Sequence, residues 1–372
     1  MALQIAAALS LAIWLYLVLG RGGFWRMQDS TLPTALPSPW PRVAIVIPAR
    51  NESEVIGKAV ASLAAQDYPG AFYIIVVDDH STDGTTAAAR GVPAPNLTVV
   101  PAEPLEPGWT GKLWAVNQGV REALRVSPDY LLLTDADIVH PPGNLSALVA
   151  QAAAGNYDLV SLMATLHCRT FAERALIPAF VFFFFLLYPP AWIRTPRRRT
   201  AGAAGGCMLI RRDKLAGLGG IERIRGELID DCALAREVKR SGGAVWLGLS
   251  ARTGSIREYG TFAEIGEVIS RTAFTQLRYS WWFLLATVGG LVLTYLVPVV
   301  AALSGNALGA GAWIVMCIAY VPILRFYGRS PFWAPALPAV ALFYLAATVH
   351  SAIAHGRGSG GMWKGRAQAA RR

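Results

Sequence analysis

The sequence predicts an α/β domain with a mostly parallel sheet and flanking helices, joined at both ends to apolar helices long enough to span a membrane. Short apolar runs alternate with segments of helical periodicity from Arg42 to about Ser280, a pattern typical of a parallel sheet covered by helices on both faces. In addition, 54% of the 372 residues are hydrophobic and only 16% are charged, which is not the balance of a soluble protein.

The N-terminal apolar stretch is predicted to be a membrane anchor that covers residues 1–20. Ala2–Leu19 is close to the roughly 20 residues that cross a hydrocarbon core. No basic residue precedes it and no small-residue cleavage site follows, so we do not expect a removable signal peptide. Arg21 and Arg26 favour a cytoplasmic location for what comes next. Residues 21–41, with four prolines, are predicted to be a linker leading away from the membrane.

Residues 281–353 are predicted to hold further membrane-spanning helices. Their three apolar stretches are Trp281–Leu303, Ala307–Leu324 and Pro331–Val349. Arg325 and Arg329 mark the second connection as cytoplasmic, so a third crossing would place the basic tail, residues 354–372, outside. Either one stretch is re-entrant or the tail departs from the positive-inside tendency, and the sequence leaves both alternatives open.

The distribution of basic residues and of cysteines indicates which binding partners and which cross-links to expect. The net charge is +10, but the basic residues cluster beside apolar segments, so we expect anionic lipid head groups and no nucleic acid as partners. The four cysteines show no paired or metal-like spacing, which fits a reducing compartment without a zinc site or a disulfide framework. They are Cys168, Cys207, Cys232 and Cys317.

Strands and helices are expected to alternate along the domain predicted over residues 42–280. Val43–Ile47 is apolar without interruption, as in a strand buried on both faces, whereas Glu52–Gln66 places apolar residues at helical spacing. The further strands expected are Phe72–Val77, Leu97–Val100, Tyr130–Leu133 and Ala204–Ile210. The further helices expected are Leu113–Val126 and one that begins at Asp230.

Polar residues follow the first two strands, at the sheet edge where open α/β sheets bind ligands. The first strand leads into Pro48–Glu52 and the second into Asp78 and Asp79. These two carboxylates can accept hydrogen bonds from a ring N–H or a ribose hydroxyl, and they repel each other unless a cation or donor arrives. Thr82–Thr85 is predicted to form a turn and helix cap, with capping as the main role of Asp83.

The next strand and the loop before it add a second group of charged residues. Asp135 and Asp137 follow the strand one residue apart, which suits a divalent metal, and a plain acidic turn is the alternative. The loop Pro107–Lys112 delivers Lys112 at the start of a helix. Backbone N–H groups and an ammonium there suit a diphosphate, with a plain helix start as the alternative.

In their order and spacing these motifs resemble the family 2 glycosyltransferases of GT-A fold, over about Arg42 to Ser280. The matching pieces are Ile47–Glu52, Gln66–Pro69, Val77–Thr85, Gly111–Lys112, Thr134–Asp137, Gly205–Met208 and Asp230–Leu234. More narrowly, the anchor, the loop Pro107–Val116, the motif Thr134–His140 and the terminal apolar segments resemble the hopene-associated glycosyltransferases of hopanoid biosynthesis, relatives of ceramide glucosyltransferase.

The resemblance implies a nucleotide-sugar donor as substrate, with its base and ribose near Glu52, Asp78 and Asp79. It also implies a Mg or Mn ion on Asp135 and Asp137 that bridges the diphosphate. The residues expected on the donor side are Pro48, Arg50, Glu52, Asp78, Asp79, Lys112, Asp135 and Arg278.

For the acceptor, the resemblance implies that Asp231 is the general base that removes a hydroxyl proton. The ordinary alternative is that Asp230 and Asp231 only cap a helix. Gly205 and Gly206 would let the backbone approach a sugar, or form a tight turn before a strand. The residues expected on the acceptor side are Gly205, Gly206, Asp230 and Tyr279.

The last motif departs from the family pattern. Related membrane enzymes carry Gln or Arg, two spacers, Arg and Trp, whereas Thr275–Tyr279 keeps Arg278, has Tyr279 in place of Trp and has Gln276 one place late. Arg278 could still reach the diphosphate. Tyr279 is either an acceptor-side platform or a simple interfacial aromatic.

Residues 176–193 are predicted to form an apolar helix in the membrane interface. A full crossing there would place Asp231 on the opposite side from Asp137. We therefore expect the phenylalanines of Phe182–Leu187 to lie in the acyl region and the arginines that follow to lie on head groups. A buried core helix followed by a solvated basic loop is the alternative.

Together these expectations describe an integral membrane protein with its catalytic domain on the cytoplasmic face of the inner (plasma) membrane. It would be a metal-dependent, inverting enzyme that transfers a sugar from a nucleotide-sugar donor, expected to be a UDP-sugar, to a hydroxyl group of a membrane lipid. That the lipid is a hopanoid rests on the resemblance alone. Polyprenyl phosphate or ceramide are the alternative acceptors. Outside enzymes, the alternative is a membrane scaffold that binds nucleotide-sugar.

Overall fold

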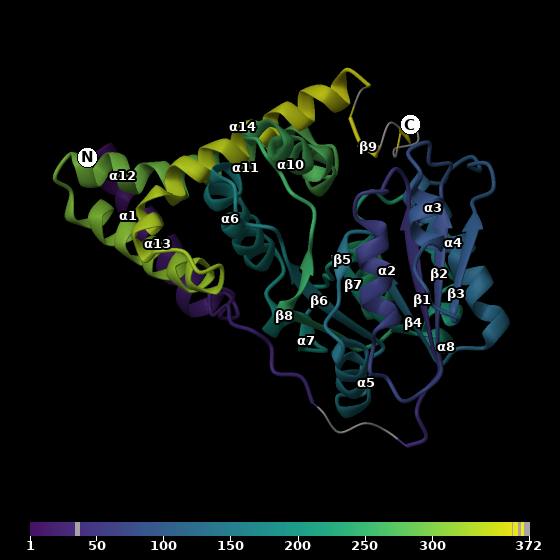
Figure 1. Cartoon of the computed structure of the whole chain (residues 1–372). Coiled ribbons are helices and arrows are strands. Elements are labelled where there is room, and N and C mark those ends of the chain that lie inside the picture. Colours follow the sequence, from purple (N-terminus) through teal and green to yellow (C-terminus); the bar gives the residue numbers. More distant parts are fainter. Residues whose placement is uncertain (34–37, 359, 364–365, 368–372) are drawn as a thin grey trace. The chain divides into compact units, whose positions relative to one another are not determined.

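The chain alternates between an α/β unit and a unit of apolar helices, as a computed structural model shows (Figure 1). The structure describes residues 1–33, 38–358, 360–363 and 366–367. Residues 34–37 of the predicted linker and Lys364, Arg371 and Arg372 of the predicted tail lie outside the described residues. The α/β unit comprises Asp29–His167, Ile193–Arg257 and the chain from Met362, and the helical unit comprises Met1–Gln28, Cys168–Trp192 and Glu258–Gly361.

Within the described part of the α/β unit, an eight-stranded sheet runs in the order β3-β2-β1-β4-β7-β6-β8-β5. Its strands are β1 (Val43–Ala49), β2 (Phe72–Asp78), β3 (Leu97–Pro101), β4 (Tyr130–Thr134), β5 (Ile138–Val139), β6 (Leu159–Thr165), β7 (Cys207–Arg211) and β8 (Val245–Ser255). Strands β3, β2, β1 and β4 are parallel to one another, and β6 is parallel to β8. Strand β7 is antiparallel to its neighbours β4 and β6, and β5 is antiparallel to β8. The prediction of a mostly parallel sheet is confirmed. A separate short pair joins β9 (Met362–Trp363) to β10 (Arg366–Ala367).

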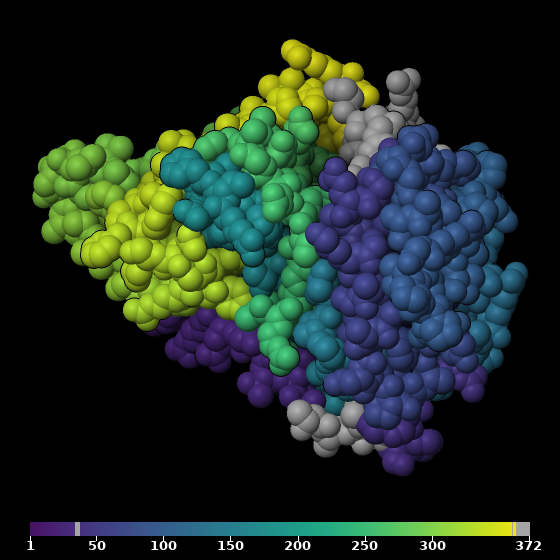
Figure 2. Space-filling model, in the orientation of Figure 1, coloured from purple at the N-terminus to yellow at the C-terminus, as the bar shows by residue number. Residues whose placement is uncertain are grey.

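Helices cover both faces of this sheet. They are α2 (Ile56–Ala64), α3 (Thr85–Arg90), α4 (Gly111–Ala123) with the 3₁₀ turn η1 (Leu124–Val126), α5 (Asn144–Ala154), α8 (Arg212–Gly217), η2 (Ile221–Ile224) and α9 (Asp230–Arg240). Ile45 and Ile47 of β1 pack with α2 and α5, while a Cβ at Gly119 of α4 would lie 2.4 Å from Cγ1 of Val46. Alternate β1 residues therefore face opposite helix layers, which explains why the strand is apolar throughout. Figure 2 shows the face of this unit formed by residues between about 40 and 130, in purple and blue.

The strands predicted early in the domain agree with the structure to within two residues. The predicted helix Glu52–Gln66 begins only at Ile56, because the backbone N–H of Glu52 donates to Thr85 Oγ1 at 2.8 Å. The predicted strand Ala204–Ile210 begins only at Cys207, since the residues before it form part of the candidate site described below. Strands β6 and β8 were not predicted.

The helical unit contains the predicted terminal apolar stretches. Its elements are α1 (Ala2–Gly20), α6 (Phe171–Leu187), α10 (Phe262–Gln276), α11 (Trp281–Leu291), the π-helical turn η3 (Val292–Leu296), α12 (Val297–Leu303), α13 (Ala307–Phe326), η4 (Pro331–Ala336) and α14 (Leu337–Gly356). The short helix α7 (Pro190–Arg194) follows α6. Among the described residues, five helices are long and apolar enough to cross a membrane. They are Ala2–Gly20, Phe171–Arg194, Trp281–Leu303, Ala307–Phe326 and Pro331–Gly356.

Helix α6 has the length of a membrane span, but its connections argue against a single crossing. The strands on either side of it in the chain, β6 and β7, are hydrogen-bonded neighbours in one sheet. The chain therefore leaves and re-enters the sheet on the same side of any membrane, which supports the prediction of an interfacial helix. Phe182 and Phe185 are buried within the protein, and Phe182 packs edge-on against Phe24 and Tyr320, so these two rings do not face acyl chains; the placement of the helix in the interface stays a prediction.

A buried carboxylate fastens together two segments through which the chain enters the helical unit. Glu173, in the first turn of α6, accepts backbone N–H groups of Arg169 at 2.8 Å, Thr170 at 2.9 Å and Tyr259 at 2.7 Å. Thr170 Oγ1 in turn donates to the carbonyl of Tyr259 at 2.9 Å. The segments that follow β6 and β8 are thus held side by side by Glu173.

Two residues of the predicted linker are hydrogen-bonded to β8. The backbone N–H of Ser30 donates to the carbonyl of Leu249 in β8 at 2.8 Å, and the N–H of Leu249 donates to Ser30 Oγ at 2.9 Å. Asp29 accepts from the N–H of Ala251 at 2.8 Å. These bonds attach the linker to the sheet.

Candidate functional site

The predicted metal residue Asp135 and the predicted acceptor-side residue Asp230 share one cation. Lys112 Nζ lies 2.8 Å from Asp135 Oδ1 and 3.1 Å from Asp230 Oδ2. Asp135 follows β4, Lys112 begins α4 and Asp230 begins α9, so three elements deliver these charges to one edge of the sheet. Burial alone would lower the pKa of Lys112, but the carboxylates of Asp135 and Asp230 raise it well above its usual value.

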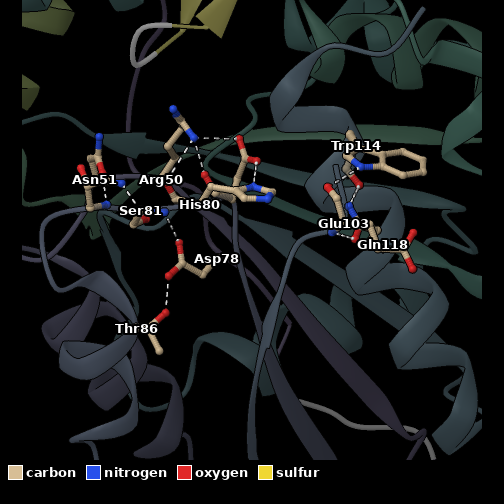
Figure 3. A network of polar contacts seen from close by, with 11 residues as sticks. Arg50, Asn51, Asp78, His80, Ser81, Thr86, Glu103, Trp114 and Gln118 are labelled. Atoms are coloured by element: carbon tan, nitrogen blue, oxygen red, sulfur yellow. Dashed lines mark hydrogen bonds and ion pairs between the residues drawn. The ribbon is translucent and has the colours of Figure 1, made fainter. Parts of the chain in front are cut away.

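The loop that carries Lys112 is fixed at both ends. Thr110 caps α4 by accepting from the N–H of Leu113, and its own N–H donates to the carbonyl of Arg225 at 2.9 Å. Trp114 Nε1 donates to the carbonyl of Glu103 at 3.0 Å (Figure 3). The capped start of α4, which carries Lys112, is therefore hydrogen-bonded to Glu103 and to Arg225.

Asp231, the predicted general base, is held by two backbone amides. The N–H of Gly205 donates to Oδ2 at 2.8 Å and the N–H of Cys232 donates to Oδ1 at 2.6 Å. Burial and the neighbouring carboxylate of Asp230 raise the pKa of Asp231 to about 7, against the opposing charge of Lys112. A carboxyl with such a pKa retains proton affinity near neutral pH, as a general base requires.

The two adjacent glycines differ in what they touch. A Cβ at Gly205 would lie 3.4 Å from Asp231 Oδ2 and 3.5 Å from Lys112 Nζ, so Gly205 borders the charged site. A Cβ at Gly206 would instead lie 3.1 Å from Cδ1 of Ile138. Gly206 therefore leaves room for the Ile138 side chain, which packs against it. The close approach of the Gly206 backbone to a sugar stays a prediction.

Asp137 is anchored by two residues that the sequence interpretation missed. Its Oδ2 accepts from Ser255 Oγ at 2.6 Å and lies 3.4 Å from Arg257 Nε. Arg257 also pairs with Glu52, which follows β1. The apolar run Val245–Leu249 is the sequence signal that could have located β8, the strand that leads to both residues.

The donor set of Asp135 and Asp137 suits a divalent ion only in part. Within the described ranges, no group of three or more His, Cys, Asp or Glu side chains could hold a metal. Two carboxylates are nevertheless sufficient for an ion such as Mg²⁺, which keeps waters and takes other ligands from phosphate oxygens. The side chain of Asp135 is 34% exposed and accessible to such an ion. The pair therefore fits a metal that binds together with a diphosphate.

The loops after β1 and β2 are tied together, as the close view shows (Figure 3). The Arg50 guanidinium donates to the carbonyl of Asp79, the N–H of Asn51 donates to Ser81 Oγ at 2.9 Å, and the N–H of Thr82 donates to Asn51 Oδ1 at 3.0 Å. These bonds bring the predicted donor-side residues of both loops to one place at the edge of the sheet.

The adjacent carboxylates Asp78 and Asp79 have different partners, which answers their mutual repulsion. Asp78 accepts from the N–H of Ser81 at 3.0 Å and from the hydroxyl of Thr86. Asp79 is buried, and its Oδ2 lies 3.7 Å from the guanidinium of Arg50. Arg50 thus supplies the cation that the pair needs.

Asp83 caps the turn before α3, as predicted. It accepts from the N–H and hydroxyl of Thr85, at 3.1 and 2.5 Å, and from the N–H of Ser53 at 3.0 Å. Burial alone would raise the pKa of Asp83, but the hydrogen bonds from Thr85 and Ser53 hold it well below its usual range.

A pocket beside Lys112 combines a polar edge with an apolar wall. Pro48, Thr134, Asp135, Gly205 and Asp230 contribute to the polar edge. The wall is formed by Leu113, Val116, Leu133, Met208, Ile221, Ile224 and Leu234. The predicted donor-side residue Pro48 therefore lines the same pocket as the predicted acceptor-side residues.

Arg278 and Tyr279 follow α10 in the helical unit. Both have positive φ angles, of 54° and 56°. The hydroxyl of Tyr279 accepts from Thr275 Oγ1 at 3.1 Å, and its ring centroid lies 5.4 Å from that of His355. The donor role of Arg278 and the acceptor role of Tyr279 stay predictions.

Residues 44–219 match the family described as Glycosyl transferase family 2. An N-acetylglucosaminyltransferase of Mesorhizobium japonicum is 27% identical over 238 residues, or 57% of this chain and 51% of the relative. A beta-monoglucosyldiacylglycerol synthase of Synechocystis is 34% identical over 127 residues, or 33% of this chain and 26% of the relative. The chain thus spans about half, or less, of the length of these curated relatives.

Among solved structures, a mannosyltransferase of Pyrobaculum calidifontis in complex with GDP-Man and Mn²⁺ has a similar fold. The TM-score is 0.57 at 20% identity, and the alignment covers 94% of this chain and 98% of the mannosyltransferase. The likeness therefore extends beyond the α/β unit to the terminal helices.

Proposed function

We propose that this protein transfers a sugar, with inversion, from a nucleotide-sugar to a hydroxyl of a membrane lipid, because residues 44–219 match the family described as Glycosyl transferase family 2. The observation that carries the proposal is the contact of Lys112 with both Asp135 and Asp230. Lys112 thus joins Asp135, which is proposed to hold the metal of the donor, to Asp230, which lies beside the candidate base, and all three line one pocket.

Asp231 is proposed to take the proton from the acceptor hydroxyl. The oxygen then attacks the anomeric carbon opposite the departing diphosphate, and no covalent intermediate is needed. Burial and Asp230 raise the pKa of Asp231 to about 7, so it combines proton affinity with a substantial ionised fraction at neutral pH. The amide of Gly205 holds the carboxylate in place for this step.

On the donor side, the tied loops with Arg50, Glu52, Asp78 and Asp79 are proposed to receive the base and ribose of a UDP-linked sugar. Asp135 and Asp137 would hold Mg²⁺ or Mn²⁺, which supplies positive charge to the leaving diphosphate. Lys112 and Arg257 lie against these two carboxylates and offset their charge. That offset lowers the repulsion that an approaching diphosphate would meet.

Two observations support a lipid acceptor. The described chain has five candidate membrane spans, and relatives are named beta-monoglucosyldiacylglycerol synthase in Synechocystis and 4,4'-diaponeurosporenoate glycosyltransferase in Staphylococcus aureus. A hopanoid acceptor is proposed on the sequence resemblance given above.

The catalytic unit is proposed to face the cytoplasm, because Arg21 and Arg26 follow the first span.

The loop after α7 is proposed to contact anionic head groups. Arg197 and Arg199 are exposed on it. Lys239 holds the loop from within, since Nζ donates to the carbonyls of Thr195 at 3.1 Å, Arg198 at 2.8 Å and Thr200 at 2.9 Å. Fixed, exposed guanidinium groups near an apolar helix suit phosphate head groups.

The test measures nucleotide release from UDP-sugars by purified membranes that contain the full chain, with and without EDTA, together with mass spectrometry of the lipids. We expect metal-dependent release and a glycolipid product. Asp231→Asn should reduce turnover about 10²- to 10⁴-fold, the usual range for loss of a general base. Asp213→Asn, which alters an exposed carboxylate on α8, serves as the control. Normal turnover by Asp231→Asn would exclude its role, and absence of turnover by the wild type would favour a binding scaffold.

A further inference from the structure

A chain of buried polar side chains runs behind the charged site. Its members are at most 5% exposed and come from β4, the segment after β5, α5 and β8: Thr134, His140, Asn144 and Thr253. Buried polar groups are costly unless they are paired, and all four are hydrogen-bonded. None of them has a role in the function proposed above.

The hydrogen bonds in this chain run in one direction. Thr253 Oγ1 donates to Asn144 Oδ1 at 2.9 Å, and Asn144 Nδ2 lies 2.9 Å from His140 Nδ1. Because Nδ1 receives that N–H, the imidazole proton is on Nε2, which lies 3.0 Å from Thr134 Oγ1. The Thr134 hydroxyl donates a hydrogen bond to the carbonyl of Gly206 at 2.7 Å.

His140 must be neutral for this arrangement. A proton on Nδ1 would point at the N–H donor of Asn144 and break the chain. Burial lowers the pKa of His140 to about 3, which keeps the ring neutral.

The ends of the chain adjoin residues of the candidate site. Thr134 directly precedes Asp135, and the carbonyl that it holds belongs to Gly206, next to the Gly205 amide that binds Asp231. At the other end, Thr253 lies two residues before Ser255 on β8, and Ser255 holds Asp137.

The segment before β7 is also fixed by hydrogen bonds from β6. Ser161 Oγ accepts the N–H of Ala204 at 2.9 Å and donates to its carbonyl at 3.1 Å. Together, Ser161 and Thr134 fix the backbone on both sides of Gly205. The position of the Gly205 amide therefore depends on the hydroxyl groups of Ser161 and Thr134.

We propose that this hydrogen-bond chain sets the spacing between Asp135, Asp137 and Asp231, and that its four members, Thr134, His140, Asn144 and Thr253, are positioning residues for the metal and diphosphate. This inference rests on the proposed function, because it takes Asp135 and Asp137 as metal ligands. Groups that orient metal ligands typically change metal affinity about 10- to 100-fold when they are removed.

The test measures Mn²⁺ binding to the purified full chain in the presence of UDP by electron paramagnetic resonance, independently of turnover. Thr134→Val keeps the shape of the side chain and removes its hydroxyl, so we expect affinity for Mn²⁺ to fall about 10-fold. Thr134→Ser keeps the hydroxyl and should bind Mn²⁺ much more tightly than Thr134→Val. Thr98→Val, an exposed position on β3, is the matched control for the exchange.

Thr253→Val tests the far end of the chain and gives a second variant should Thr134→Val fail to fold. Because the two hydroxyls belong to one network, the double variant should lose less affinity than the product of the two single losses. Wild-type affinity in Thr134→Val, or losses that multiply fully, would overturn the inference. If the wild type binds no Mn²⁺ with UDP, the proposed metal role fails, and the inference fails with it.

Discussion

At the scale of single residues, the site depends on carboxylates whose charges are partly offset within a few ångströms. Lys112 pairs with both Asp135 and Asp230, and Arg257 pairs with both Asp137 and Glu52, so each cation is shared by two carboxylates. Asp231 is the exception, because its nearest charged neighbour in the chain is another carboxylate. The different environments of Asp230 and Asp231 explain why only one of two adjacent aspartates suits proton transfer.

The pH dependence of turnover follows from Asp231. The base acts when ionised, so kcat/KM should rise with pH and level off above the pKa, near 7. The positive charge of Lys112 lowers this pKa, so Lys112→Met should move the rising limb to higher pH as well as reduce turnover. A pH series of nucleotide release checks this, with Lys58→Met on α2 as the control. A limb that stays in place in Lys112→Met would contradict the role of this charge.

The same carboxyl should lower stability at alkaline pH. Its pKa in the folded protein is raised above the unfolded value near 3.8, so its stabilising contribution is complete below that value and is lost as pH rises to about 7. Asp231→Asn should therefore raise Tm at pH 8 by about 2 °C or more, and by less at pH 5.

Thermal unfolding of the two proteins at both pH values measures the effect. An equal change of Tm at pH 5 and pH 8 would mean that ionisation of Asp231 has no part in stability. A gain of stability with a loss of turnover is the trade-off expected when a functional group is buried with its charge unfavourably placed.

At the scale of elements, how well the sequence predicts a segment depends on where its partners lie. Strands β1, β2 and β4 are apolar throughout because helices cover both faces, and this local pattern was sufficient to predict them. The role of Arg257 could not be predicted, because its partner Glu52 lies 205 positions away in the chain. The same holds for Thr253 and Asn144, which are 109 positions apart.

The strand β8 was missed for a related reason. The apolar run of its first half, Val245–Leu249, does not continue into its second half, which is partly exposed and contains Ser250, Thr253 and Gly254. Its pairing with β6 changes register near Thr165, which no local pattern in either segment reveals. The candidate-site residues Ser255 and Arg257 therefore escaped prediction along with the strand.

The start of α6 provides a test of element-scale stability. Glu173 accepts three backbone N–H groups and is fully buried, so Glu173→Ala would leave those donors unpaired at a cost of about 3 kcal/mol or more. Glu264 forms a similar capping box on α10 but is exposed, and Glu264→Ala should cost only about 1 kcal/mol.

Thermal unfolding of the detergent-solubilised protein compares the two variants directly. Equal losses of stability would mean that joining the two chain segments at Glu173 contributes nothing beyond an ordinary helix cap.

At the scale of the whole molecule, membrane topology is constrained by the sheet. Because β6 pairs with β7, the segment Cys168–Trp192, which leaves the α/β unit between these two strands, must come back on the side where it began. The terminal apolar stretches were recognised as candidate membrane spans from composition alone. The return of α6 was predicted because Asp137 and Asp231 were assigned to one site, and the pairing of β6 with β7 adds an independent reason.

Cysteine labelling in intact cells tests this topology. In a protein without Cys168 and Cys317, cysteines introduced at the exposed positions Arg199 and Ser127 should both be protected from an impermeant maleimide and react after lysis. Labelling of Arg199→Cys in intact cells while Ser127→Cys stays protected would show that α6 crosses the membrane.

The ammonium of Lys112 also bears on the order in which substrates bind. A diphosphate that arrives at Asp135 competes for the same three N–H donors that steady Asp230, so the environment of the acceptor hydroxyl changes only once the donor is in place. We therefore expect the donor to bind first and the lipid second. In initial-rate kinetics, free nucleotide would then compete with the nucleotide-sugar but not with the lipid.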